Sequence, residues 1–133
     1  MRIPLILLTS ALFCLLVSPM ATGEPKLDLE ASLVDADANA QQASAVVRVE
    51  VVGADLIDPA LATPGSKAIQ AHLHYRVDDG PVIATPVAKL AFHDLAAGRH
   101  RIEVTLADPE HKPLGPSQIL EVTIPARLVG IDQ

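Results

Sequence analysis

The stretch Arg99–Ala107 (RHRIEVTLA) decides the fold, because it has the most regular alternation of apolar and polar residues in the chain. Its apolar residues Ile102, Val104 and Leu106 recur with a period of two, which is typical of a β-strand with one buried face. A second stretch, Ala45–Val52 (AVVRVEVV), is rich in β-branched residues, which favour strands. No stretch shows the apolar period of a long helix, so the sequence predicts an all-β protein.

Further short strands are predicted on both sides of these two. Turn residues separate them, as in Asp78–Pro81 (DDGP), where Gly80 is free to take a positive φ. The polar, Ala-rich residues 35–44 predict a loop or one helical turn, and residues 53–70 form a long loop for a compact domain. The remaining predicted strands are Leu27–Leu33, Ala71–Val77, Val82–Ala84, Val87–Phe92 and Gln118–Ile124.

About seven short strands with frequent turns are typical of an immunoglobulin-like β-sandwich. Many such sandwiches have a Leu-x-x-Gly-x-Tyr corner, in which the Tyr bonds back to the preceding loop. Residues 95–100 (LAAGRH) match this pattern with His100 in place of the Tyr. His100 is in phase with the inward-facing Ile102, so we expect it to be a structural corner residue and not a ligand.

Residues 1–23 predict a secretory signal peptide. The second residue is basic, Ile3–Val17 is an apolar core, and Ala21–Gly23 (ATG) has the small-x-small pattern of a cleavage site. One alternative is an uncleaved anchor, but the apolar run is shorter than the roughly 20 residues that span a bilayer. Another is lipidation of Cys14, which lies among bulky residues inside that run. We expect cleavage without a stable membrane span, a single domain over residues 24–133, and export to a periplasm or beyond.

Composition excludes several classes of function. The 133 residues carry a formal charge of −6 at pH 7, only 2% are aromatic, and the single cysteine lies in the predicted signal peptide. The mature chain therefore offers no disulfide, no thiol chemistry, no stacking platform for bases and no basic surface for nucleic acid. It also has no serine-hydrolase elbow, phosphate-binding glycine loop or His-Glu-x-x-His motif, so we expect no enzyme activity.

Four strings in the second half of the chain resemble one protein family. They are His72–Pro81 (HLHYRVDDGP), Lys89–Leu95 (KLAFHDL), Gly98–Ile102 (GRHRI) and His111–Pro116 (HKPLGP). The family is one of small exported bacterial proteins that are classed as a domain of unknown function, and the similarity covers about residues 53–125. It implies an exported, immunoglobulin-like domain, and it brings no reaction, substrate or catalytic residue with it.

The chain has five histidines, which are its main candidates for functional side chains. The predicted topology divides them into two groups. If the strands 71–77 and 99–107 are antiparallel neighbours, the first begins beside the end of the second. Three histidines then gather with the 53–70 loop at one end of the sandwich, and two lie at the other end. The first group is His72, His74 and His111, and the second is His93 and His100.

His72 and His74 are two residues apart and share one strand face, which we expect to be exposed, while Leu73 and Tyr75 point into the core. With His111 from the adjacent loop, they have a suitable geometry for a divalent metal. Without Cys or Met the mature chain offers no soft-ligand Cu(I) or blue-copper site, which leaves Cu(II) or Zn(II). Such binding would weaken as the histidines become protonated near pH 6.

Three acidic residues are candidates for a further ligand, namely Asp58, Asp108 and Glu110. A simpler interpretation is that the strand histidines are solvated polar residues. In that case His74 faces Glu103 or Glu121 across the strands as an ordinary pair.

Two functions follow from this sequence. The first is an exported, non-enzymatic binding or accessory module that recognises an unknown protein or small ligand through the loops around His72 and His111. These loops include the Pro-rich residues 111–116, which predict a rigid loop whose Leu114 caps the core. The alternative is a periplasmic protein that binds Cu(II) or Zn(II) through the three histidines.

Overall fold

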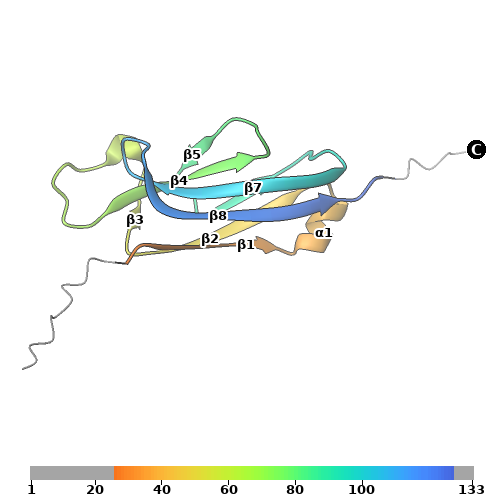
Figure 1. Ribbon diagram of the computed structural model, residues 1–133, viewed down its shortest axis with the longest axis horizontal. Coiled ribbons are helices and arrows are strands. Elements are labelled where there is room, and N and C mark those ends of the chain that lie inside the picture. The colour runs from red at the N-terminus through yellow and green to blue at the C-terminus, as the bar shows by residue number, and fades with distance from the viewer. Residues whose placement is uncertain (1–25, 128–133) are drawn as a thin grey trace, which may run out of the picture.

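The computed structural model describes residues 26–127, which form two β-sheets packed face to face (Figure 1). The strands are β1 (Asp28–Val34), β2 (Ala45–Val52), β3 (Asp55–Leu56), β4 (Gln70–Val77), β5 (Ile83–Thr85), β6 (Lys89–Phe92), β7 (Gly98–Ala107) and β8 (Pro113–Ile124). A short helix, α1 (Ala36–Gln41), and a 3-10 turn, η1 (Pro59–Leu61), complete the described elements. The predicted signal peptide lies outside the described residues.

The strand order confirms the predicted all-β, immunoglobulin-like sandwich. One sheet has the order β1-β2-β6, and the other has the order β3-β4-β7-β8, with β5 also paired to β4. The pairs β1–β2, β2–β6, β4–β7 and β7–β8 are antiparallel, as in other sandwiches of this type. None of the helices in residues 26–127 has the length and apolar character needed to cross a membrane.

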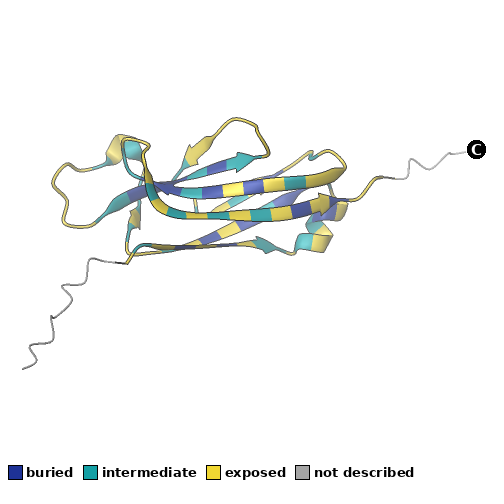
Figure 2. Ribbon diagram, viewed as in Figure 1, coloured by how far each residue is buried: buried dark blue, intermediate teal, exposed yellow. Residues whose placement is uncertain are grey.

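The core is mainly aliphatic, as predicted, with two aromatic residues added, and it lies between the inner faces of the two sheets (Figure 2). It exists because alternate residues of each strand point inward, which gives β2 and β7 their alternating burial. Its aromatic members are Tyr75 and Phe92, and the Tyr75 hydroxyl donates a hydrogen bond to the Val87 carbonyl at 2.8 Å. Its largest fully buried apolar side chains are Leu73, Tyr75, Ile102, Leu106, Val47 and Val104.

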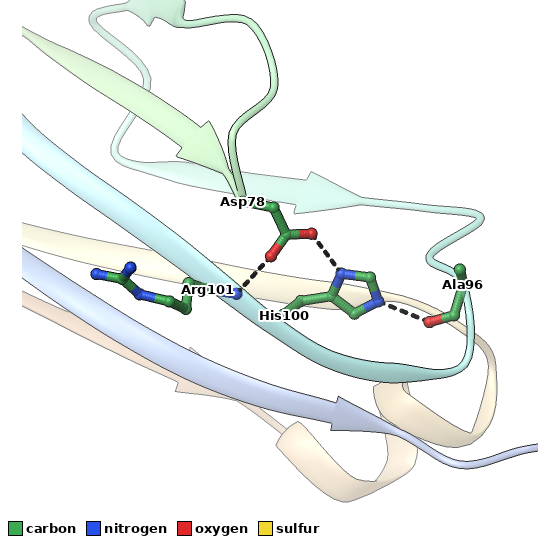
Figure 3. Close-up of polar contacts among 4 residues, drawn as sticks. All are labelled: Asp78, Ala96, His100 and Arg101. Carbon is green, nitrogen blue, oxygen red and sulfur yellow. Dashed lines mark hydrogen bonds and ion pairs between the residues drawn. The ribbon is translucent and has the colours of Figure 1, made fainter.

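The predicted corner at His100 is confirmed (Figure 3). His100 Nε2 donates to the Ala96 carbonyl at 2.6 Å, and Nδ1 donates to Asp78 Oδ2 at 2.7 Å. Asp78 Oδ1 accepts from the Arg101 backbone N–H, so the same carboxylate joins β7 to the end of β4. Both partners of the ring are acceptors, so this arrangement favours the protonated imidazolium, in which both ring nitrogens donate. Its pKa is raised, first by the Ala96 carbonyl and then by Asp78.

The segment between β2 and β4 is more ordered than the predicted loop. Its β3 strand pairs in parallel with the start of β4, with Asp55 opposite Gln70 and Leu56 opposite Ala71. Gly53 makes the turn into β3 at a φ of +88°, and a Cβ there would lie only 2.6 Å from the Lys26 carbonyl oxygen. This position therefore requires glycine.

Strand β8 begins earlier than predicted. Pro113 already pairs with Ala107 of β7, across an irregularity in register between Thr105 and Ala107. The prediction of a rigid loop over residues 111–116 is therefore wrong from Pro113 onward, where prolines are tolerated because β8 is an edge strand. Leu114 is half-buried and packs against the core, as expected of a capping residue.

The two sheets are also joined along one side by a single side chain. Gln118 of β8 accepts a hydrogen bond from the Ala31 backbone N–H at 2.7 Å through Oε1. Its Nε2 donates to the Ala31 carbonyl at 2.8 Å. Gln118 thus satisfies both backbone groups of one β1 residue from the opposite sheet.

Candidate metal centre

Three histidines meet at the end of the sandwich where β4 begins and β7 ends. His72 and His74 belong to β4, and His111 belongs to the turn between β7 and β8. The antiparallel pairing of β4 with β7 sets His72 opposite Ala107, so the turn after β7 lies beside the start of β4. The predicted convergence of these three residues is therefore confirmed.

One nitrogen of each ring points to a common centre. His72 Nε2 lies 2.8 Å from His74 Nε2 and 3.1 Å from His111 Nδ1. The third side of the triangle, from His74 Nε2 to His111 Nδ1, is 3.3 Å. Nitrogens bound to one ion at about 2.0–2.1 Å lie about 3.3 Å apart in a tetrahedral site and about 2.9 Å apart on one face of an octahedral site. The triangle therefore has the dimensions of a metal-ligand set.

Hydrogen bonds among the three rings cannot account for the close contacts of their nitrogens. A neutral imidazole nitrogen is either a donor or an acceptor, never both. Among three nitrogens in mutual contact, at least one contact must therefore join two donors or two acceptors. A cation at the centre removes the conflict, because all three nitrogens can then direct lone pairs at it.

The site is graded from buried to exposed. His72 is fully buried, His74 is half-buried, and His111 is exposed. Burial lowers the pKa of His72, and the nearby His74 and His111 lower it further. The pKa of His74 is lowered by burial first and by His111 second. Both rings are therefore held in the neutral form, which is the form that binds metals.

The expected exposure of His72 is wrong. Its ring packs against the rings of His74 and His111, with centroids 4.7 and 4.8 Å away. The segment that contains β3 and η1 lies at this same end of the molecule (Figure 1). The outer face of β4 is therefore covered at His72, and its Nδ1 is buried without a hydrogen-bond partner among the described residues.

The turn that carries His111 is organised by Asp108. Asp108 Oδ1 accepts hydrogen bonds from the Glu110 and Lys112 backbone N–H groups, both at 2.9 Å. The Asp108 backbone carbonyl accepts from the His111 N–H at 2.9 Å, and the Asp108 N–H donates to the Lys112 carbonyl at 2.8 Å. This closed turn holds His111 at a φ of +65° with its ring over His72. This role of Asp108 was not predicted from the sequence, although an Asp followed closely by turn residues is its signal.

The three acidic candidates do not join the triangle. Within residues 26–127, the group of side chains placed to share one ion here consists of the histidines alone. Asp58 instead caps η1, because its Oδ1 accepts from the Ala60 N–H at 2.9 Å. Asp58 and Asp108 still lie close enough to raise the pKa of His72 by their charge, against the stronger effects that lower it.

The alternative cross-strand pairs of His74 are also absent. His74 lies opposite Thr105, while Glu103 lies opposite Arg76. Glu121 instead forms an ion pair with Arg99 at 2.9 Å. At the other end of the sandwich, His93 is exposed just after β6, so the division of the histidines is as predicted.

A small apolar cavity lies at that far end. Its volume is about 170 Å³, below the roughly 300–1,000 Å³ of most small-molecule sites. It is lined by Ala40, Gln41, Ala43, Leu95, Ala97, Ile124, Pro125 and Arg127. None of the five histidines lines this cavity.

No known family model matches the chain, and no curated protein is similar to it in sequence. The resemblance to a family of exported bacterial proteins therefore stays a prediction. The function must be argued from the site itself.

Proposed function

We propose that this protein is an exported, non-enzymatic metal-binding protein that holds one Zn(II) or Cu(II) ion through His72, His74 and His111. The observation that carries the proposal is the triangle of ring nitrogens with sides of 2.8, 3.1 and 3.3 Å. Its members come from two segments far apart in the sequence, so the fold itself brings them together.

The donor set selects the class of metal. Imidazole nitrogen suits Zn(II) and Cu(II), whereas Ca(II) and Mg(II) prefer oxygen ligands. No thiolate or thioether is present in residues 26–127, so the donors there do not favour Cu(I). Between Zn(II) and Cu(II), the Irving–Williams order favours Cu(II) when both are equally available.

The predicted signal peptide supports the exported part of the proposal. Residues 1–23 combine a basic start, an apolar core and a small-x-small site, which together direct a chain out of the cytoplasm. A periplasm or the extracellular medium is then where the metal is bound.

Calorimetric titration of the purified protein, prepared without an affinity His-tag, tests the proposal. We expect one equivalent of Zn(II) or Cu(II) to bind at neutral pH. His111→Ala removes an exposed ligand and should weaken binding at least about tenfold, and His72→Ala combined with His111→Ala should abolish it. His93→Ala is the matched control, because it removes an exposed histidine at the far end and should leave binding unchanged.

Because His72 is buried, thermal unfolding of each variant must show that it still folds. The proposal fails if neither metal gives a binding signal, or if the folded double variant binds as well as the wild type. Mass spectrometry of the native protein gives a second readout, since a bound metal should be present in near-stoichiometric amounts.

A second candidate is a protein-binding module at the same end. Leu61 of η1 is 70% exposed there and offers a partner an apolar contact. Leu56 and Leu114, at the same end, pack against the core. Capture of a partner that is lost in Leu61→Ser, with unchanged metal binding, would support this candidate.

A further inference from the structure

We infer that the metal ion bound by the three histidines keeps one coordination position open to solvent, and that this position takes a small anion. The inference rests on the metal binding proposed above and adds to it the class of ligand that the bound metal accepts.

The number of protein ligands leaves a position free. Zn(II) sites in proteins are almost always four-coordinate, and sites with three protein ligands fill the fourth position with water or an exogenous group. Within the described part of the chain, the only side chains placed to share the ion are His72, His74 and His111. Three ligands therefore give the open type of site and not the closed, structural type.

The nearest carboxylates are engaged elsewhere. Asp108 Oδ1 is held by two backbone N–H groups of its own turn, and Asp58 Oδ1 is held by the Ala60 N–H. Neither side chain is placed to share the ion, and a movement that brought one of them to it would break the hydrogen bonds that shape the segments around the site. That movement would cost about 1 kcal/mol or more for each bond broken.

The burial of the ligands places the open position at the surface. His72 forms the floor, because it is fully buried, whereas His111 is exposed and His74 is half-buried. The rings of His74 and His111 have centroids 5.5 Å apart and their facing nitrogens 3.3 Å apart, so the two rings meet edge to edge. An ion held by these nitrogens and by that of His72 is approached from the solvent side, where His111 is exposed.

Charge decides which ligand fits. Three neutral imidazoles leave both positive charges of the ion uncompensated, and a bound cation is the largest local charge in such a site. The nearby carboxylates of Asp58 and Asp108 are constrained by their own turns. A small anion is therefore the ligand that best completes the site.

Azide titration of the Co(II)-loaded protein tests this inference, because Co(II) replaces Zn(II) and its visible bands report coordination. We expect azide to shift these bands in a saturable way, with one azide per metal. Asp58→Asn and His93→Ala should give the same starting spectrum and the same shift, since neither residue supplies a ligand. His111→Ala should lose the wild-type spectrum even without azide.

Two results separate this inference from the proposed function. Wild-type protein that binds Co(II) but whose bands ignore azide would overturn the open position and leave metal binding intact. A changed starting spectrum in Asp58→Asn would also overturn it, because a carboxylate would then fill the position. Failure of the wild type to bind Zn(II), Cu(II) or Co(II) would overturn the proposed function, and this inference with it.

Discussion

Asp108 shows how one carboxylate can position a proposed metal ligand without belonging to the ligand set. It accepts two backbone hydrogen bonds within its turn and places His111 in the left-handed region of backbone conformation. Non-glycine residues rarely adopt this conformation without support, and it costs roughly 1–2 kcal/mol. Asp108 is therefore a positioning residue for His111.

Replacing Asp108 tests this role at the scale of one residue. Asp108→Ala removes the acceptor of both hydrogen bonds, so we expect the affinity for Zn(II) to fall about tenfold, as when other supporting partners of metal ligands are removed. Asp108→Asn keeps the Oδ1 acceptor and should restore most of the affinity. Calorimetric titration compares the Zn(II) affinities of both variants with that of the wild type. A wild-type affinity in Asp108→Ala would show that the turn does not position His111.

Gly53 offers a second test at this scale. At this position an alanine would combine a left-handed φ with a Cβ only 2.6 Å from the Lys26 carbonyl oxygen. We expect Gly53→Ala to lower the free energy of unfolding by about 2 kcal/mol or more. Gly65→Ala is the matched control, because Gly65 also has a positive φ but its Cβ would meet nothing within 4 Å. Urea unfolding should show the smaller loss for Gly65→Ala.

At the scale of elements, the corner between β4 and β7 depends on the charge of His100. The pKa of His100 is raised above 6.5 in the folded state, by the Ala96 carbonyl first and Asp78 second. Its contribution to stability is therefore complete below the unfolded pKa and is lost as the pH rises through the raised folded pKa. The pKa of Asp78 is lowered, chiefly by the Arg101 N–H, so its contribution is lost only as the pH falls through that lowered value.

We expect the wild type to be more stable than His100→Gln at mildly acidic pH, with the difference shrinking as the pH becomes alkaline. Urea unfolding of both proteins with a chelator present, at several pH values, gives the measurement. Using the difference between the two proteins cancels the titration of the other histidines. A difference that stays constant or grows toward alkaline pH would contradict the protonated corner.

The strands themselves were predictable because alternation is a local property of the sequence. Ala45–Val52 is a strand at the predicted bounds, and the inward phase of Ile102 and His100 holds. The burial of His72 was not predictable, because it depends on contacts with His111, which is remote in sequence. The early start of β8 at Pro113 was not predictable for a similar reason. Only pairing with Ala107 makes this proline-rich segment a strand.

At the scale of the whole molecule, metal binding and folding are linked. The three ligands come from β4 and from the turn before β8, and only the folded chain brings them together. A metal that binds the native state alone stabilises it by about 2.7 kcal/mol when its free concentration is 100 times the Kd. Metal binding at the proposed site would therefore add to the stability of a sandwich that has no disulfide in its described part.

Thermal unfolding measures this linkage. We expect Zn(II) to raise the Tm of the wild type by several degrees and a chelator to reverse the rise. His111→Ala should keep nearly the wild-type Tm without metal, because His111 is exposed, and should lose the metal-dependent rise. An equal rise in both proteins would place the bound metal elsewhere.

The two hydrogen bonds between Gln118 and Ala31 affect how this protein behaves at high concentration. An edge strand with unpaired backbone N–H and carbonyl groups can pair with a strand of another molecule, which leads to aggregation. Gln118 occupies the donor and the acceptor of Ala31 in the middle of β1, as an incoming strand would. The side-chain amide of Gln118 thus protects the edge of β1 at Ala31 from pairing with a strand of another molecule.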